Sequence, residues 1–332
     1  MFRKRFIGAL VGAIALVGLV LTPVSASYPG AANGRIAVAV RAANGSFNIY
    51  SMQPNGAGLM ALTSGTGRHL CPDYSADGKQ IAYCSDVSGA WEIWTMKQNG
   101  TRQTQLTDFG AFAIFPDFSP NGSTIAFSGF VGAPQNDQIY VVDAATGLAP
   151  QQLTNCPTST PNCFSDYPVW SPDGTKIAFT RGDGFDADDN PVNEQVWIMN
   201  SDGTNAHALT SGADPKDQVP DWSPDGSRIA YSSGQFGSEG IWTMNADGSN
   251  QRQLTGCGPT DPAPCEAGDD WGTAWSPDGS KIAFLRDLTS LGIPDRPVYV
   301  MNADGSDATR ITTTPGLRGV PAWQARGTDS DQ

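Results

Sequence analysis

The chain has 332 residues, of which 39% are hydrophobic, and it carries 33 acidic against 20 basic side chains. This apolar content is ample for a sizeable core, so we expect a globular protein. The formal net charge of −13 argues against a nucleic-acid-binding protein, which needs a basic surface, and against binding to anionic membranes. We therefore expect a neutral or cationic partner.

The first 26 residues have the parts of a secretory signal peptide. Basic residues at positions 3–5 precede an apolar run at 7–21, and Val24-Ser25-Ala26 provides small residues suited to a cleavage site. The run is shorter than the about 20 residues that span a bilayer, and no other segment of the sequence is apolar enough to do so. We predict that residues 1–26 are a signal peptide and that the mature protein, whose charge falls from −13 to −16 with the three basic residues, is periplasmic or extracellular.

Short runs rich in β-branched and aromatic residues follow, at 36–40, 49–52 and 59–63. A motif of the form Pro-x-aromatic-Ser-x-Asp/Asn-Gly, followed by Ile-Ala-aromatic, begins at residue 72 and recurs at 116, 168 and 220, with a fifth copy at 273 that has Thr in place of Pro. The spacing of roughly 50 residues indicates a repeat architecture. The anchoring aromatic residues of the units, with a sixth near the C-terminus, are Tyr74, Phe118, Trp170, Trp222, Trp275 and Trp323.

Each unit also has a second apolar run, at 93–96, 139–142, 196–199, 241–244 and 298–301, and then a Leu-Thr or Ile-Thr step. Asp-Gly and Asn-Gly turns separate the runs, which predicts four short antiparallel strands per unit. That is the pattern of a β-propeller blade. The runs at 36–63 supply the second, third and fourth strands of one more blade, and residues 320–323 supply its first strand. We predict an all-β fold, a six-bladed β-propeller at 27–324 whose C-terminal strand closes the N-terminal blade, and a polar tail at 325–332.

The repeated Trp-Ser-Pro-Asp-Gly and Ile-Ala-Phe segments, with Met-Asn-Ala-Asp-Gly after the third strand, resemble the WD-repeat-like propeller of the TolB family. The resemblance covers about residues 33–324 and implies six blades. In the TolB protein an α/β domain that binds other Tol-system components precedes the propeller, whereas here the repeats follow the predicted signal peptide directly. The resemblance therefore implies the fold rather than a Tol-system role.

The cysteines form three pairs of neighbours in the sequence. An even number of cysteines in an exported chain indicates disulfides, and no spacing matches a C-x-x-C motif. Because six cysteines allow several connectivities, the repeat register decides the pairing. We predict three local bridges: Cys71–Cys84, Cys156–Cys163 and Cys257–Cys265.

The register also indicates a ring of residues at one mouth of the central channel, on the face that carries the long loops. The positions five and four residues before each anchoring aromatic should begin the innermost strands. We expect these side chains to be solvated, with an Asp/Arg pair between neighbouring blades as the alternative to a binding site. The candidate ligand-binding residues are His69, Asp166, Asp217, Asp270, Trp271 and Arg318.

The sequence gives little support for a metal site. The spacing of Asp186, Asp188 and Asn190 matches the first three ligands of an EF-hand calcium loop. Pro191 and Trp197, however, stand where an EF-hand needs Gly and Glu. The Asp residues of the short Asp-Gly turns are expected to bond to their own backbone. We expect no cofactor, with calcium at 186–190 as the weaker alternative.

The sequence favours binding over catalysis. It has 2 histidines, too few for the His ligand cluster of the metal-dependent lyases that resemble this repeat class, and it has no Gly-x-Ser-x-Gly motif. We expect a monomeric, non-catalytic protein that binds a protein segment or a cell-envelope ligand at its loop face and channel mouth. The alternative is a carbohydrate-active or other hydrolytic or lyase enzyme that uses the carboxylates of the mouth.

Overall fold

The computed structural model describes residues 31–326 apart from 111, 131–135, 149, 187, 189, 213–215, 235–238, 257–267, 314–315 and 317. The predicted signal peptide and the Cys257–Cys265 pair lie outside the described residues. So do residues 327–332 of the predicted tail.

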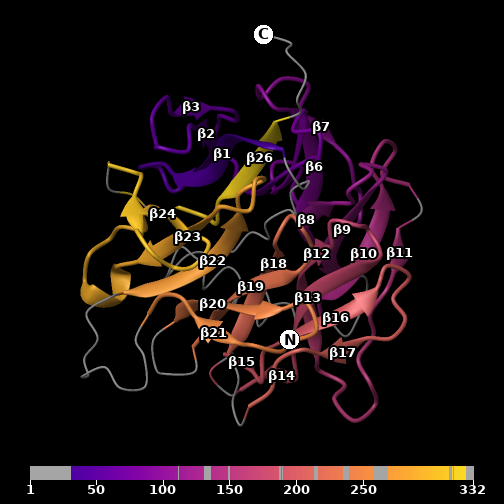
Figure 1. Cartoon of the computed structure of the whole chain (residues 1–332). Helices are drawn as coiled ribbons and strands as arrows, with labels where there is room; N and C mark the ends of the chain where they lie inside the picture. The colour runs from indigo at the N-terminus through magenta and orange to yellow at the C-terminus, as the bar shows by residue number, and fades with distance from the viewer. Residues whose placement is uncertain are drawn as a thin grey trace.

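Six four-stranded antiparallel sheets surround a central axis, as predicted (Figure 1). Blade 1 contains β26 (Ala322–Arg326), β1 (Ala32–Arg41), β2 (Phe47–Met52) and β3 (Met60–Ala61). Blade 2 contains β4 (His69–Tyr74), β5 (Gln80–Ser85), β6 (Glu92–Lys97) and β7 (Thr104–Gln105), and blade 3 contains β8 (Phe112–Phe118), β9 (Thr124–Phe130), β10 (Gln138–Asp143) and β11 (Gln151–Gln152). Blade 4 contains β12 (Phe164–Trp170), β13 (Lys176–Gly182), β16 (Gln195–Asn200) and β17 (His207–Ala208).

Blade 5 contains β18 (Asp217–Trp222), β19 (Arg228–Ser233), β20 (Gly240–Asn245) and β21 (Arg252–Gln253). Blade 6 contains β22 (Asp269–Trp275), β23 (Lys281–Asp287), β24 (Val298–Asn302) and β25 (Thr309–Arg310), with the short 3-10 helix η2 (Thr289–Leu291) before β24. A two-stranded hairpin, β14 (Gly184–Phe185) with β15 (Pro191–Val192), extends from blade 4.

The second strand of each blade is buried on both faces, because every blade packs between two neighbours. Ile177, Ala178 and Phe179 of β13 are fully buried, and the Ile-Ala-aromatic triplets of blades 2, 3, 5 and 6 are equally buried. The anchoring Trp170 belongs to a cluster that also contains Ile139 of blade 3. The repeated apolar residues therefore form the interfaces between blades.

The first strand of each of blades 2 to 6 has a bulge at its third mouth-side position. The residues there, Cys71, Phe115, Tyr167, Val219 and Gly272, have φ between 53° and 66°, in the left-handed region. This conformation is strained for residues other than glycine. In blades 4, 5 and 6 a hydroxyl group of the preceding blade accepts the hydrogen bond of the bulge N–H: Ser128 for Tyr167, Thr180 for Val219 and Ser232 for Gly272.

Three buried aspartates link neighbouring blades. Asp73, Asp117 and Asp221 stand directly before the anchoring aromatics of blades 2, 3 and 5. Each carboxylate accepts a hydrogen bond from the backbone N–H of the next blade's anchoring aromatic: Phe118 at 2.9 Å, Trp170 at 2.8 Å and Trp275 at 2.6 Å. The carboxylates therefore satisfy backbone donors at blade boundaries that would otherwise be buried without partners.

The ring closes as the sequence predicts. Ile36 of β1 pairs with Trp323 of β26, and Ala32 pairs with Arg326, so the strand continues through residues 325 and 326. Asn33 also bonds to Asp278 in the first turn of blade 6, with its amide 3.0 Å from the carboxylate. Closure removes the open sheet edges that would remain between the first and last blades.

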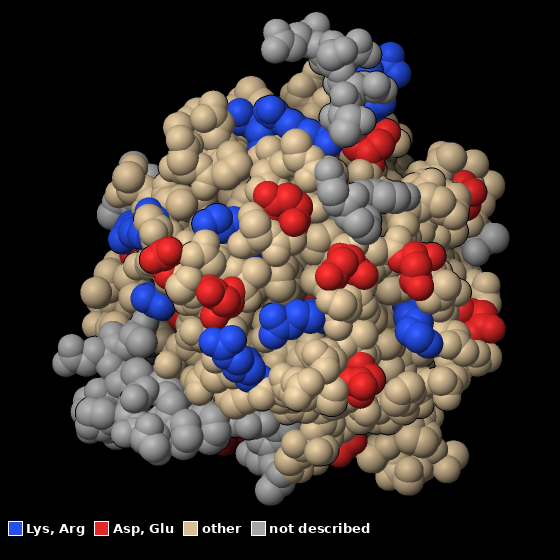
Figure 2. Space-filling model, in the orientation of Figure 1, with Lys and Arg blue, Asp and Glu red and all other residues tan. Residues whose placement is uncertain are grey.

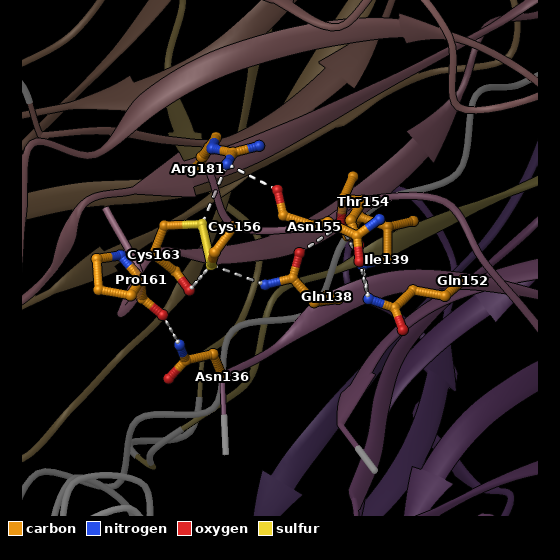
Figure 3. The surroundings of a disulfide bond; sticks show 10 residues. All are labelled: Asn136, Gln138, Ile139, Gln152, Thr154, Asn155, Cys156, Pro161, Cys163 and Arg181. Carbon is orange, nitrogen blue, oxygen red and sulfur yellow. Dashed lines mark hydrogen bonds between the residues drawn. A yellow bond between two sulfur atoms is a disulfide. The ribbon is translucent and has the colours of Figure 1, made fainter. Parts of the chain in front are cut away.

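Two of the predicted disulfides are confirmed, Cys71–Cys84 and Cys156–Cys163. The first is fully buried and joins the bulge of β4 to β5. The second holds the loop between β11 and β12, where the Arg181 guanidinium donates to the carbonyl of Asn155 at 3.0 Å (Figure 3). Both bridges suit an oxidising compartment.

Candidate functional site

The start of each inner strand lies beside the third strand of the preceding blade. The backbone N–H groups of Ser165, Asp217 and Asp270 donate to the carbonyls of Asp137, Glu194 and Glu239 at 2.8, 3.0 and 2.9 Å. A second set of residues, two positions before the first buried hydrophobic residue of each third strand in blades 2 to 6, therefore belongs to the mouth. This set comprises Trp91, Asp137, Glu194, Glu239 and Arg296. The motifs of the first strands do not indicate this second set, although the register of the third strands identifies its positions.

The prediction that the mouth side chains are solvated is wrong. Asp217 and Asp270 are 0% exposed, and His69, Trp271 and Arg318 are 2–5% exposed. Asp166 is partly buried. The repeat register correctly orders the residues around the axis, but it does not show that neighbouring blades cover them.

His69 is a buried histidine with a partner. Its Nδ1 lies 3.1 Å from Ser85 Oγ, and its ring packs edge-on against Tyr83 with 5.9 Å between centroids. Burial lowers the pKa of His69, an effect that exceeds the opposing charge of Asp86. The His69 side chain therefore supports the packing of blade 2.

One side of the mouth, built by blades 6 and 1, neutralises its acids with arginines. We call this the arginine half; it contains Asp270, Asp287 and Asp295 with Arg286, Arg296, Arg310 and Arg318. Asp270 pairs with Arg286 of its own blade through two hydrogen bonds of 2.6 and 2.8 Å. Asp270 therefore pairs with an arginine of its own blade.

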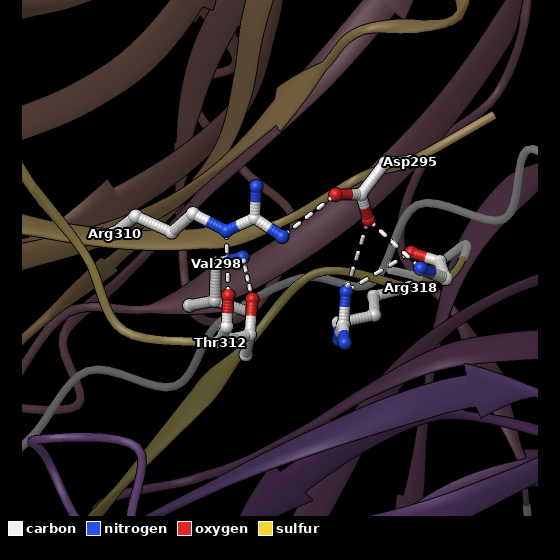
Figure 4. Close-up of polar contacts among 6 residues, drawn as sticks. Asp295, Val298, Arg310, Thr312 and Arg318 are labelled. Atoms are coloured by element: carbon white, nitrogen blue, oxygen red, sulfur yellow. Dashed lines mark hydrogen bonds and ion pairs between the residues drawn. The ribbon is translucent and has the colours of Figure 1, made fainter. Parts of the chain in front are cut away.

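Arg318 pairs instead with Asp295, which also accepts a hydrogen bond from Arg310 at 2.7 Å (Figure 4). Asp287 accepts a 2.9 Å hydrogen bond from Arg296, whose guanidinium lies 5.2 Å from the centroid of the Trp271 ring. Trp271 and Arg318 thus take part in buried contacts within and between blades 6 and 1. Such pairs stabilise only because every charge has a partner.

The other side of the mouth, built by blades 3 to 5, has acids that pair with no arginine among the described residues, although the charge of Lys216 opposes the rise in the pKa of Glu194 and Glu239. We call this the acidic half; it contains Asp137, Asp166, Glu194, Asp217 and Glu239. Burial raises the pKa of Glu194 to about 8, with the charges of Glu239 and Asp166 adding to the effect. Burial likewise raises the pKa of Glu239 to about 7 and that of Asp166 to about 7.

Several carboxyl oxygens of the acidic half have no hydrogen-bond partner among the described residues. These are one oxygen of Asp137 and one of Asp166, and the two oxygens of Asp217 have only the hydroxyl groups of Ser233 and Thr210 beside them. Asp137 and Asp166 also interact with each other, because the charge of Asp166 raises the pKa of Asp137 further after burial. A buried polar atom without a partner costs about 1–3 kcal/mol, so the acidic half is held at an energetic cost.

At the weaker calcium candidate, residues 186–190, one carboxylate already accepts hydrogen bonds from the backbone of its own loop. Asp186 accepts backbone hydrogen bonds from Asp188 and Asn190 at 2.8 and 2.9 Å. The turn aspartates also bond to their own backbone, as predicted; Asp173, for example, accepts from Thr175 N–H at 3.0 Å. Among the described residues, no group of three or more His, Cys, Asp or Glu side chains is arranged to hold a metal ion.

Open cavities lie on the opposite face, between the short turns. One of about 510 Å³ separates the first turns of blades 2 and 3, and one of about 340 Å³ separates those of blades 4 and 5. Charged residues of both signs lie side by side on the face drawn in Figure 2. Where the structure describes the chain, no helix is long and apolar enough to cross a membrane.

Blade number, strand order and closure define the protein as a six-bladed β-propeller. The family model of the TolB beta propeller domain matches residues 98–270, more than half of the chain. The chain therefore belongs to the TolB beta-propeller domain family.

Solved structures agree with this fold. TolB from Acinetobacter baumannii is 20% identical with a TM-score of 0.68, over 96% of this chain and 71% of that one. A putative TolB from Agrobacterium tumefaciens is 22% identical with a TM-score of 0.63, over 88% of this chain and 97% of that one. An oligogalacturonate lyase from Vibrio parahaemolyticus is 16% identical with a TM-score of 0.52, over 87% of this chain and 75% of that one. At these identities the similarity extends to the fold alone.

Proposed function

We propose that this protein is exported and acts as a non-catalytic binding protein, whose channel mouth receives a cationic group of a protein segment or a cell-envelope ligand. The proposal rests on the acidic half of the mouth. Its buried carboxyl groups lack the arginine partners that the arginine half has, and the described residues offer the Asp217 carboxyl group only the hydroxyl groups of Ser233 and Thr210. An ammonium group would supply both donors and charge.

Export is supported by the signal-peptide pattern at residues 1–26 and by the two disulfides. Binding is supported by the membership of the TolB propeller family. The negative charge of the chain favours a cationic ligand, whose association should weaken as salt rises.

The raised pKa values predict a particular pH dependence. Near neutral pH, carboxyl groups such as Glu194 and Glu239 retain protons for a large part of the time, because their pKa values are about 8 and about 7. A bound cation favours the ionised form, so binding releases protons. The affinity should therefore rise with pH between about 6 and 9.

The test is calorimetric titration of the mature protein with the peptide acetyl-Ala-Ala-Lys-Ala-Ala amide and with its norleucine counterpart, which keeps the aliphatic chain and removes the only charge. We expect the lysine peptide alone to bind, more tightly at pH 8 than at pH 6, and D217N to bind it about tenfold more weakly. Asp202→Asn, in an exposed turn, is the matched control. Equal binding of the two peptides, or unchanged binding by D217N, would contradict the proposal.

A second candidate is an enzyme, favoured by one observation. Asp137 and Asp166 are neighbouring carboxyl groups with raised pKa values, and a raised pKa suits the general acid of glycoside cleavage. Turnover of a panel of glycans, abolished by D166N with the fold intact, would establish catalysis and reject the non-catalytic proposal. The absence of turnover across the panel would support binding.

A further inference from the structure

The turns that join the first and second strands form a second ring, on the face opposite the mouth. In blades 2 to 6 the fourth residue of each turn is a glycine, whose N–H donates to the carbonyl of the serine at the first position at 2.7–2.8 Å. The second residue is proline in blades 3 to 6, at Pro120, Pro172, Pro224 and Pro277, and alanine in blade 2, at Ala76.

The prolines of blades 3, 4 and 5 each pack against the glycine in the corresponding turn of the next blade. A Cβ atom placed on Gly174 would lie 3.7 Å from Pro120, one on Gly226 would lie 3.8 Å from Pro172, and one on Gly279 would lie 3.3 Å from Pro224. The pyrrolidine ring thus covers the glycine backbone of the next blade. Where the two chain ends meet, Ala325 and Gln324 cover Gly78 instead.

Blade 2 lacks this contact. A Cβ atom placed on Gly122 would meet nothing within 4 Å, and the 510 Å³ cavity lies at this place, lined by Ala76 and Gly122 among others. The corresponding cavity beside Pro172 measures about 340 Å³. Both volumes fall within the range of about 300–1,000 Å³ that is typical of ligand sites, and the cavity beside Gly122 is the larger of the two.

The lining suits a peptide. Ser75, Asp77, Gln80 and Asn121 line the cavity with the apolar Ala76 and Pro120. Gln80 and Asn121 are exposed, and side-chain amides both donate to and accept from peptide groups. A proline residue of a bound segment would place its ring over Gly122, as Pro120 covers Gly174.

We propose that the cavity between the first turns of blades 2 and 3, the proline hollow (Ser75, Ala76, Asp77, Gln80, Asn121 and Gly122), binds a proline-containing segment of a partner protein. This site is independent of the channel mouth. In three other turns a proline ring packs over the glycine of the next blade, and we expect the proline of the partner to pack over Gly122 in the same way. Because residue 76 is alanine and not proline, no ring of the protein itself covers Gly122.

The test titrates the mature protein with acetyl-Gly-Ser-Pro-Gly amide and with its alanine counterpart, followed by amide shifts in nuclear magnetic resonance. We expect the proline peptide to shift the signals of Ala76 and Gly122 and to bind about tenfold more tightly than the alanine peptide, which lacks two ring methylene groups. A76P should abolish binding, because its own ring fills the hollow. The four prolines at equivalent turns indicate that A76P folds, which a melting curve confirms.

P172A is the matched control, because it removes a ring from another turn and leaves the proline hollow unchanged. It should bind the peptide at Ala76 as the unaltered protein does. Equal affinity for the two peptides, shifts confined to other regions, or full binding by A76P would overturn the proposal. Binding that appears only after deletion of residues 27–30 would also overturn it, since the occupant would then be the chain's own N-terminal segment. None of these results depends on the lysine peptide or on Asp217, so failure here is distinguishable from failure of the mouth proposal.

Discussion

Glu194 should make the protein less stable as the pH rises, and removing its charge should reverse that effect. The side chain is 7% exposed, and its pKa is raised from 4.5 to about 8 by burial and by neighbouring carboxylates. A carboxyl group whose pKa is raised by folding contributes its full stabilisation below pH 4.5 and loses it progressively up to the folded-state pKa. We therefore expect the free energy of unfolding to fall between pH 4.5 and pH 8.

The magnitude follows from the two pKa values. At about 1.4 kcal/mol per pH unit, the interval from 4.5 to about 8 corresponds to about 5 kcal/mol above pH 8, and about 3 kcal/mol of this is lost by pH 7. Glu194→Gln keeps the size and polarity of the protonated form but cannot ionise. It should match the unaltered protein near pH 4 and be more stable by about 3 kcal/mol at pH 7.

The assay is urea unfolding followed by tryptophan fluorescence at pH 4, 5, 6, 7 and 8. Glu92→Gln is the matched control, because Glu92 is a buried glutamate in blade 2 whose carboxylate accepts hydrogen bonds from the backbone of Phe109 and Gly110 at 2.9 and 3.1 Å. E92Q should be destabilised rather than stabilised. If the free energy of unfolding of E194Q depends on pH as that of the unaltered protein does, or if E194Q is less stable at pH 8, then ionisation of Glu194 does not destabilise the folded protein.

Three further predictions concern the ring itself. A chain that ends at Arg318 lacks β26 and leaves two open sheet edges, so it should aggregate or melt far lower in calorimetry; an unchanged melting temperature would exclude closure by this strand. Asp117→Ala should cost about 1–3 kcal/mol in urea unfolding at pH 4 because it leaves the N–H of Trp170 without an acceptor, whereas D117N, which keeps an acceptor, should cost less; the low pH is chosen because burial raises the pKa of Asp117, and equal losses would reject the role of this hydrogen bond. Replacing Cys71 and Cys84 by serine should cost about 3 kcal/mol, because the bridge closes a loop with a sequence separation of 13, and unchanged stability would show that packing alone holds the bulge.

The repeat made the fold predictable from the sequence. The spacing of the anchoring aromatics from Tyr74 to Trp323 reflects one blade per unit, and the residues at 36–63 and 320–323 could complete a blade only together. The Cys71–Cys84 pairing followed from the same register, since it joins opposed strands of one blade. Such patterns are visible in the sequence because each blade buries side chains at the same positions.

The environment of the mouth was less predictable, because it depends on contacts between blades. The sequence placed Asp217 and Asp270 at equivalent positions, yet Asp217 has only the neutral hydroxyl groups of Ser233 and Thr210 beside it among the described residues, whereas Asp270 pairs with Arg286. The difference arises in the second strand, where Ser233 stands opposite Asp217 and Arg286 stands opposite Asp270. Aligning the second strands against the first would have revealed this partner, whereas the burial of both carboxylates required the packed ring.

The two halves of the mouth use buried charge in opposite ways, and the contrast bears on function. In the arginine half each acid has a cation within hydrogen-bonding distance, which offsets desolvation, and the Asp295–Arg318 pair joins blade 6 to the segment that leads into blade 1. In the acidic half the desolvation is not offset by arginine and is relieved by protons instead. A group that lowers the stability of the empty protein is not explained by folding alone. Because an ammonium ligand would replace those protons, the same carboxyl groups should reduce stability at neutral pH and provide affinity, so ligand binding should stabilise the protein most at the pH at which the empty protein is least stable.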